Sequence, residues 1–351
     1  MAKQQHKLNL RAGEVVEVRS REEILATLDE NGRLDNLPFM PEMLEYCGKK
    51  LKVYKRAHKT CDNIKAWSLR RVKDAVHLEG IRCDGSDHAG CQAGCLIFWK
   101  EAWLKRAGET AAAQQPSRGR GCSVESLMRA TQRGGTGSDT IYACQGTDLR
   151  EFSSHLSWWH IGQYFADITS GNLVTGLGAG EAAHRLLETV LSVMQLLRAM
   201  VIMMFNRVQR GRHSAQYPHI EGALDKTPRC DLNLQPGEFV QIRSKDEIVA
   251  TLNQTNRNRG LVFEGEMLRY CGGFHRVLRR VERIIDEKTG KLIDMKNPCI
   301  VLDGVFCQGD NHLCCPRGIY SYWRENWLVR SNEAPVAEGA RPEEAATCHR
   351  C

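Results

Sequence analysis

The chain has 351 residues, of which 42% are hydrophobic and 26% charged, and its formal net charge is +7. These values are ordinary for globular proteins and exclude a wholly disordered chain, a collagen and a small disulfide-stabilised scaffold. The one unusual value is the cysteine count of 15.

The N-terminal segment and the distribution of charge indicate the compartment and the partners to expect. The N-terminal segment MAKQQHKLNLRAGE lacks the apolar core of a secretory leader, so we predict a cytoplasmic protein. In a reducing compartment, cysteines serve more often as metal ligands or free thiols than as disulfides. Residues 1–106 carry 20 basic and 15 acidic side chains, and this excess keeps nucleic-acid binding by the region as an alternative.

The chain contains an internal repeat. A shift of 224 residues (232 − 8) places 8–106 on 232–330 without a gap, and about a third of the paired positions are identical. The matching stretches are LNLRAGEVVEVRSREEILATL (8–28) with LNLQPGEFVQIRSKDEIVATL (232–252), EMLEYCG (42–48) with EMLRYCG (266–272), and WKEAWLKR (99–106) with WRENWLVR (323–330). One module of about 100 residues is therefore used twice.

Between the copies the composition changes, first to small and polar residues and then to aromatic and aliphatic ones. Such shifts mark linkers and segment boundaries. We predict an α+β fold in which two small β-rich modules flank a mainly helical middle segment. The predicted segments are a β-rich Cys/His module at 1–106, a linker at 107–139, the helical middle at 140–221, the second module at 222–331 and a disordered tail at 332–351.

Within the module, the elements are predicted in chain order. Val16 and Val18 alternate with charged side chains, which indicates a strand. Ser20 and Glu23 then form a capping-box pattern that predicts a short helix. The remaining predictions are strands around Val53 and Val277 and at 76–83 and 300–307, a hairpin turn at Thr289-Gly290, and a closing helical turn at Trp99–Leu104.

The GExVxVRSxxEIxxTL opening, the YCG and the terminal WxExWLxR resemble a module of uncharacterised bacterial proteins. The resemblance covers 8–106 and 232–330 and leaves out the middle segment. The opening strand also resembles the start of SH3-like barrels, which implies a small β-rich barrel. The resemblance supplies no catalytic residues.

Both copies carry three cysteines and a histidine in the pattern C-x35-C-x4-H-x2-C. Zinc favours four sulfur or nitrogen ligands, and Cys3His is a common structural set. A metal that closes this long loop would stabilise a module with a limited core. We therefore predict two zinc ions per chain, with ligands Cys47, Cys83, His88 and Cys91 in one copy and Cys271, Cys307, His312 and Cys315 in the other.

The fourth ligand of each predicted site stays open. Cys47 and Cys271 each follow a tyrosine and precede a glycine, and a cysteine also packs well as a small hydrophobic residue. A purely structural or a redox role for the cysteines is therefore an alternative. The cysteines that differ between the copies are further candidates for the fourth position: Cys61, Cys95, Cys299 and Cys314.

The middle segment is rich in aromatic and polar side chains, which line either a ligand pocket or a packed core. The candidates are Trp158, Trp159, Tyr164 and Phe165, with His155, His160, Asp148 and Asp167 nearby. A helix is predicted from about Glu181 to Arg207, with Glu181, His184 and Glu188 on one face; Glu151 and His155 are also spaced as neighbours on a helix. Di-iron bundles need two such motifs and more carboxylates than this segment shows. A metal-dependent or biosynthetic enzyme with its site in 141–190 is kept as an alternative function.

The longest apolar stretch, Val190–Phe205, contains Gln195 and Arg198 and is shorter than the roughly 20 residues of a membrane span. We predict a buried helix and no membrane span, with a membrane-surface helix as the alternative. Its apolar side chains would pack inside or form a partner surface: Leu187, Val190, Leu191, Met194, Leu197, Val201 and Met204.

The chain shows no P-loop, no G-x-G-x-x-G after a strand and no G-x-S-x-G. The leading hypothesis is a non-catalytic binding or scaffold protein built on two zinc-stabilised modules, with a protein partner or a small molecule as ligand. Surfaces near four tryptophans are the candidate binding regions: Trp99, Trp103, Trp323 and Trp327.

Overall fold

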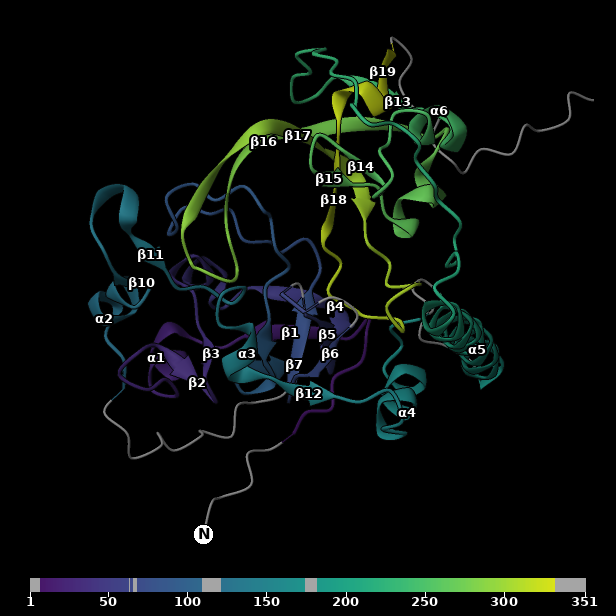
Figure 1. The fold of residues 1–351 in the computed structure, drawn as a ribbon. Coiled ribbons are helices and arrows are strands. Elements are labelled where there is room, and N and C mark those ends of the chain that lie inside the picture. Colours follow the sequence, from purple (N-terminus) through teal and green to yellow (C-terminus); the bar gives the residue numbers. More distant parts are fainter. Residues whose placement is uncertain (1–6, 63, 66–67, 109–120, 174–181, 332–351) are drawn as a thin grey trace, which may run out of the picture.

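A computed structural model describes residues 7–62, 64–65, 68–108, 121–173 and 182–331, with only the backbone at 182–185. It contains helices together with several antiparallel sheets, so the α+β class is confirmed. Figure 1 shows two β-rich bodies, one from each end of the chain, with helices beside them. The predicted tail at 332–351 lies outside the described residues.

The first body is built on a five-stranded sheet in the order β8-β7-β4-β1-β9. Its helix α1 (Arg21–Leu25) begins at Ser20, and the predicted capping box with Glu23 is confirmed. The strands are β1 (Val15–Val18), β4 (Lys50–Arg56), β7 (Ala75–Leu78), β8 (Trp99–Lys100) and β9 (Leu104–Arg106). The connections hold β2 (Arg33–Leu34), β3 (Leu37–Pro38), η1 (Pro41–Tyr46), β5 (Lys59–Cys61), β6 (Leu69–Arg71) and η2 (Glu101–Trp103).

The second body has a five-stranded sheet in the order β18-β17-β16-β13-β19. Its strands are β13 (Phe239–Ile242), β16 (Phe274–Ile285), β17 (Leu292–Phe306), β18 (Tyr320–Trp323) and β19 (Leu328–Ser331). The connections hold α6 (Lys245–Val249), β14 (Arg257–Asn258), β15 (Leu261–Val262), η4 (Gly265–Tyr270) and η5 (Glu325–Trp327). Three of these elements, β13, α6 and β19, begin 224 residues after β1, α1 and β9 (239 − 15, 245 − 21, 328 − 104).

The core of each body is built around two buried tryptophans. Trp99 and Trp103 pack edge-on against Phe39, and Trp323 and Trp327 pack in the same way against Phe263. All four indole rings are inaccessible to solvent. The tryptophans therefore stabilise the modules and do not themselves form a binding surface.

The two bodies touch through reciprocal contacts. The backbone N–H of Ile285 donates to Sγ of Cys91 at 3.3 Å, and the N–H of Cys61 donates to Sγ of Cys315 at 3.1 Å. Both partners differ by the same interval (285 − 61 and 315 − 91 are each 224), so the two contacts are related by the repeat. The hairpin of β16 and β17, whose predicted turn at Thr289-Gly290 is confirmed, extends over the first body to Tyr142 (Figure 1).

The middle segment joins both bodies. Its strand β12 (Ser154–Leu156) extends the β6-β5 sheet of the first body, and β11 pairs with β10. The other elements are α2 (Val124–Arg129), β10 (Gln132–Gly134), η3 (Gly137–Asp139), β11 (Ile141–Tyr142), α3 (Leu149–Phe152), α4 (Gly162–Thr169) and α5 (Ala182–Gly211).

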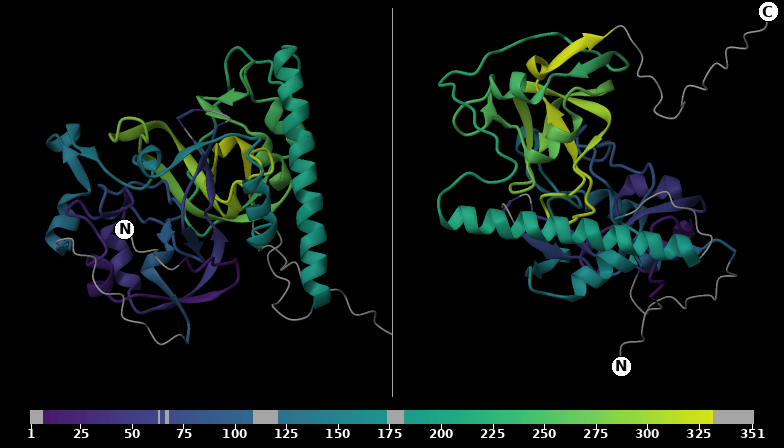
Figure 2. Two further views of the ribbon diagram at one scale, coloured as in Figure 1. Left: turned by 90° about the horizontal axis from the view of Figure 1, so that it is seen from below. Right: turned by 90° about the vertical axis from the view of Figure 1, so that its right-hand side faces the viewer.

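Helix α5 corrects one prediction. It was expected to be buried, but ten of its large apolar side chains are exposed, and it lies along the outside of the molecule (Figure 2). The prediction is wrong because the buried side of the helix is narrow: it carries Leu196 together with small and polar residues such as Ser192 and Asn206. By length and composition alone, Leu186–Gly211 is apolar enough to cross a membrane.

The first core also contains a histidine, which makes stability depend on pH. His77 is inaccessible to solvent, and burial lowers its pKa from 6.5 to about 3. Below about pH 6.5 this histidine is therefore protonated in the unfolded chain but stays neutral in the folded chain. The free energy of unfolding consequently falls as the pH drops towards 3. This group alone is expected to remove about 2 kcal/mol of unfolding free energy between pH 7 and pH 5.

The measurement is urea unfolding of His77→Val at both pH values. Val301, also buried, occupies the equivalent position of the second body (77 + 224) and shows that the module accepts valine there. The difference between pH 7 and pH 5 is expected to shrink by about 2 kcal/mol in the variant. An unchanged difference would contradict the role of His77.

Candidate metal centre and adjoining pocket

A carboxylate, a thiol and an imidazole converge in the first body. The ligand atoms of Glu42, Cys83 and His88 all lie within 4.8 Å of one another. Glu42 comes from η1, and the other two belong to the loop that follows β7. Gly85 allows this loop to close, because its φ is +79° and a Cβ there would lie 2.0 Å from the carbonyl oxygen of Cys91.

Two of the three groups in this cluster lack hydrogen-bond partners among the described residues. Neither carboxylate oxygen of Glu42 and neither ring nitrogen of His88 has a hydrogen-bond partner among the described residues. Burial and the nearby Asp87 carboxyl group raise the pKa of Glu42 to about 8. Burial, followed by the charge of Glu42, raises the pKa of Cys83, and burial lowers that of His88. A cation would satisfy all three groups at once.

Further sulfurs surround the cluster. Cys91, Cys95 and Cys144 line the same cavity of about 40 Å³ as the three converging residues. Cys91 is one of the predicted ligands, whereas Cys144 comes from the middle segment and was not assigned to a site. Cys47, the predicted fourth ligand, is not among the lining residues; it lies near Arg21 and packs on the first core.

In the second body, the corresponding residues are Glu266, Cys307 and His312 (each 224 positions later). Among the described residues no second group is as tight as the first, so these three lie farther apart. Glu266 is buried, one of its oxygens has no partner among the described residues, and burial raises its pKa. Its other oxygen accepts a hydrogen bond from the N–H of Asn311 at 2.6 Å.

Cys315, the remaining predicted ligand of the second body, lies near Cys307. Cys61, which belongs to the first body, bonds to Cys315 through its backbone, and the nearby Cys315 thiol raises the pKa of Cys61. Burial raises the pKa of Cys307, to which Glu266 and Cys61 also contribute. Cys271, the predicted fourth ligand, is half-buried and packs on the second core near Lys245.

Sequence reasoning missed Glu42 and Glu266. Both are the first residue of the EMLxYCG motif, five positions before Cys47 and Cys271. Their identity in the two copies was the available signal. The approach of Cys61 to the other body had no such signal, because only the fold brings residues 61 and 315 together.

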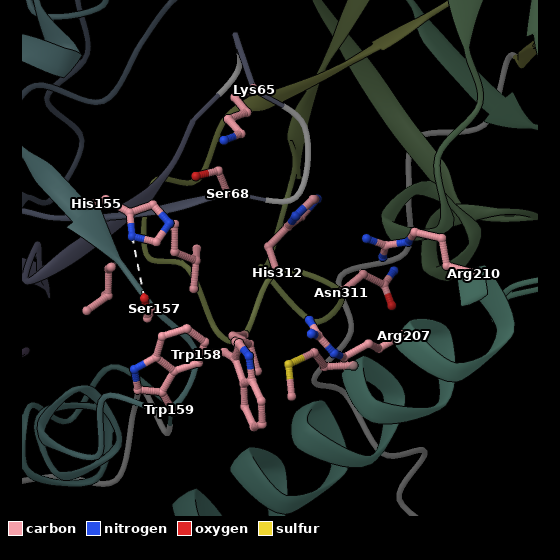
Figure 3. A pocket seen from close by; sticks show the side chains of 14 residues that line it. Lys65, Ser68, His155, Ser157, Trp158, Trp159, Arg207, Arg210, Asn311 and His312 are labelled. Atoms are coloured by element: carbon pink, nitrogen blue, oxygen red, sulfur yellow. Dashed lines mark hydrogen bonds between the residues drawn. The ribbon is translucent and has the colours of Figure 1, made fainter.

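A larger pocket of about 330 Å³ adjoins the second cluster (Figure 3). Trp158 and Trp159 form one wall after strand β12, and Arg207 and Arg210 extend towards the pocket from α5. His312 lies between these walls. The guanidinium of Arg207 lies 5.5 Å from the centre of the Trp158 ring, within the range of a cation–π contact.

Of the predicted middle-segment residues, His155, Trp158 and Trp159 line this pocket. Asp167 is instead buried between His58 and Lys59, and Asp148 pairs with Arg33 and Arg133. The other predicted residues, Tyr164, Phe165 and His160, are not among the lining residues. Glu151 and His155 belong to α3 and β12 and share no helix, and the side chains of Glu181 and His184 lie outside the described residues.

Comparisons with known proteins add nothing to this geometry. No family model, no curated protein and no solved structure matches the chain. The assignment of function therefore depends on the clusters and the pocket.

Proposed function

We propose that the protein is a non-catalytic binding protein in which two copies of one module, each stabilised by a zinc ion, flank a middle segment. The observation that carries the proposal is the convergence of Glu42, Cys83 and His88, in which the carboxylate of Glu42 and the imidazole of His88 form no hydrogen bond among the described residues. The proposed ligand sets are Glu42, Cys83, His88 and Cys91 in the first module and Glu266, Cys307, His312 and Cys315 in the second.

Register and chemistry support two equivalent sites. The four residue types recur in the same order at one interval of 224 positions. Cysteine, histidine and glutamate are all zinc ligands, and four of them complete a tetrahedral site. In the second module, Cys61 supplies a further thiol beside Cys315. The strand orders of the two sheets support copies of one module, and the likeness to SH3-like barrels stays a prediction.

The elemental content of the purified protein tests the metal assignment. We expect two zinc ions per chain, measured by mass spectrometry of the metals together with the protein concentration. One zinc would limit the proposal to the first module. Iron, or no metal at all, would contradict it.

The pocket supports a small-molecule ligand that combines a flat ring with negative charge. Two indoles offer a surface for a planar ring, and Lys65, Arg207 and Arg210 contribute positive charge. None of the described residues that line the pocket is acidic. A nucleoside phosphate has this chemistry.

Binding of adenosine monophosphate is the corresponding test, followed by tryptophan fluorescence. Replacing Arg207 by glutamine removes a charge and its contact with Trp158, and is expected to weaken binding about tenfold. The control is Arg212→Gln, which removes the same positive charge from an exposed arginine that does not line the pocket. Equal affinity for adenosine and its monophosphate would exclude an anion site.

A metal-dependent enzyme is the second candidate function, and His312 favours it. This residue belongs to the second proposed zinc set and also lines the pocket, so a metal there would be reachable by a bound molecule. Iron in place of zinc in the elemental analysis would favour this candidate over a structural metal.

A further inference from the structure

The outer face of α5 carries an apolar stripe with a regular spacing. Seven residues alternate at intervals of three and four positions: Leu187, Val190, Met194, Leu197, Val201, Met204 and Val208. All seven are exposed. This is the a and d pattern of a coiled-coil seam, in which each apolar residue inserts between residues of a second helix.

The opposite face of α5 attaches the helix to the body. Ser192, Ala199 and Asn206 recur every seven residues and are only 2 to 4% exposed. They occupy the f position, which points directly away from the a and d seam. The Asn206 side chain donates to the carbonyl oxygen of Tyr217 and accepts from its N–H, both at 2.7 Å. The seam therefore lies opposite the buried side of the helix, and the helix itself lies along the outside of the molecule (Figure 2).

The exposed area is large enough for a stable dimer. Ten apolar side chains between Leu186 and Val208 are 39 to 68% exposed. Together they leave roughly 1,000 Å² of surface, compared with the ~800 Å² that each partner buries in a typical specific interface. The exposed apolar area of α5 is also larger than the largest apolar patch on most monomeric proteins.

We propose that α5 pairs with α5 of a second copy of this chain, forming a two-stranded coiled coil that makes the protein a homodimer. A two-fold dimer uses the same patch on both subunits, and a heptad seam is complementary to itself. The dimer goes beyond the proposed function, since neither the metal clusters nor the pocket requires it.

A second helix fits this face better than a lipid bilayer does. Arg198 is exposed beside Leu197, in the middle of the helix, where a membrane span would place it in the hydrocarbon. The helix also packs on a folded body, because Leu196 and Ala199 lie in one buried cluster with Cys314. In a coiled coil, by contrast, Arg198 at the e position stays at the edge of the seam and in water.

The test is the molar mass of the full chain in solution, measured by light scattering after size-exclusion chromatography. The wild type is expected at twice the mass of one chain, and to stay there at high salt because the contact is apolar. Met194→Glu combined with Val201→Glu is expected at the mass of one chain, with unchanged circular dichroism and metal content. The control Ile293→Glu changes a side chain that is 45% exposed on β17 and is expected to stay dimeric.

Three results would overturn the proposal. The first is a wild-type mass of one chain at micromolar concentration. The second is a dimer that survives the double change in α5. The third is a monomer that sediments with phosphatidylcholine and phosphatidylglycerol vesicles, which would make the apolar stripe of α5 a membrane-binding surface.

Discussion

Replacing Glu42 by glutamine is expected to remove one of the two proposed zinc ions from the chain and to lower its melting temperature by about 10 °C or more. The carboxylate converges with Cys83 and His88, and an amide of the same shape cannot supply the negative charge. The loop that these residues close would then lose its metal. Zinc analysis and thermal unfolding of the same preparation measure both effects.

Cys47→Ser is the matched control for Glu42→Gln. The two residues are five positions apart in the same motif, and sequence reasoning chose the cysteine as the ligand. The structure places it near Arg21, outside the cavity of the cluster. The serine variant is therefore expected to keep both of the proposed zinc ions. Loss of zinc from Cys47→Ser, with retention in Glu42→Gln, would restore the Cys3His set and reject the one proposed from the structure.

The local elements of each module were predictable from sequence. The box formed by Ser20 and Glu23 depends on residues three positions apart, and the turn at Thr289-Gly290 depends on two neighbours. Such signals are complete within one short stretch. Repetition strengthened them, because the same pattern occurs with Ser244 and Glu247 in the second copy.

The site was predictable only in part, because its geometry comes from the fold. Spacing placed Cys83, His88 and Cys91 on one loop, and in the structure all three line one cavity. Spacing did not show which side chain of the EMLEYCG stretch (42–48) faces that loop, and Glu42 faces it rather than Cys47.

Helix α5 shows the same limit of sequence reasoning. Its sequence is apolar on more than one side, so hydrophobicity alone did not indicate which side contacts the body. Three of the buried residues, Ser192, Ala199 and Asn206, are small or polar, whereas Leu196 is apolar. Ala199 packs with Cys314, which lies far away in the chain, and local patterns do not contain such a contact.

Replacing Asp167 by asparagine is expected to lower the free energy of unfolding by about 3–5 kcal/mol. The carboxylate lies 2.6 Å from Nζ of Lys59 and 3.0 Å from Nε2 of His58, and both Asp167 and Lys59 are inaccessible to solvent. The asparagine leaves the lysine charge buried without a counter-charge. Denaturant unfolding measures the loss.

Two further variants test whether the loss comes from the buried lysine charge that has no counter-charge. Asp231→Asn breaks an ion pair with Arg229 of the same 2.6 Å length, in which both side chains are more than half exposed. Its longer contact with Arg280, at 3.8 Å, is also lost, but Arg280 keeps Glu325 at 2.7 Å, so no measurable loss is expected. Adding Lys59→Met to Asp167→Asn removes the buried cation and is expected to recover part of the stability. If the double variant were no more stable than Asp167→Asn alone, the cost would instead come from the packing of β5 against α4.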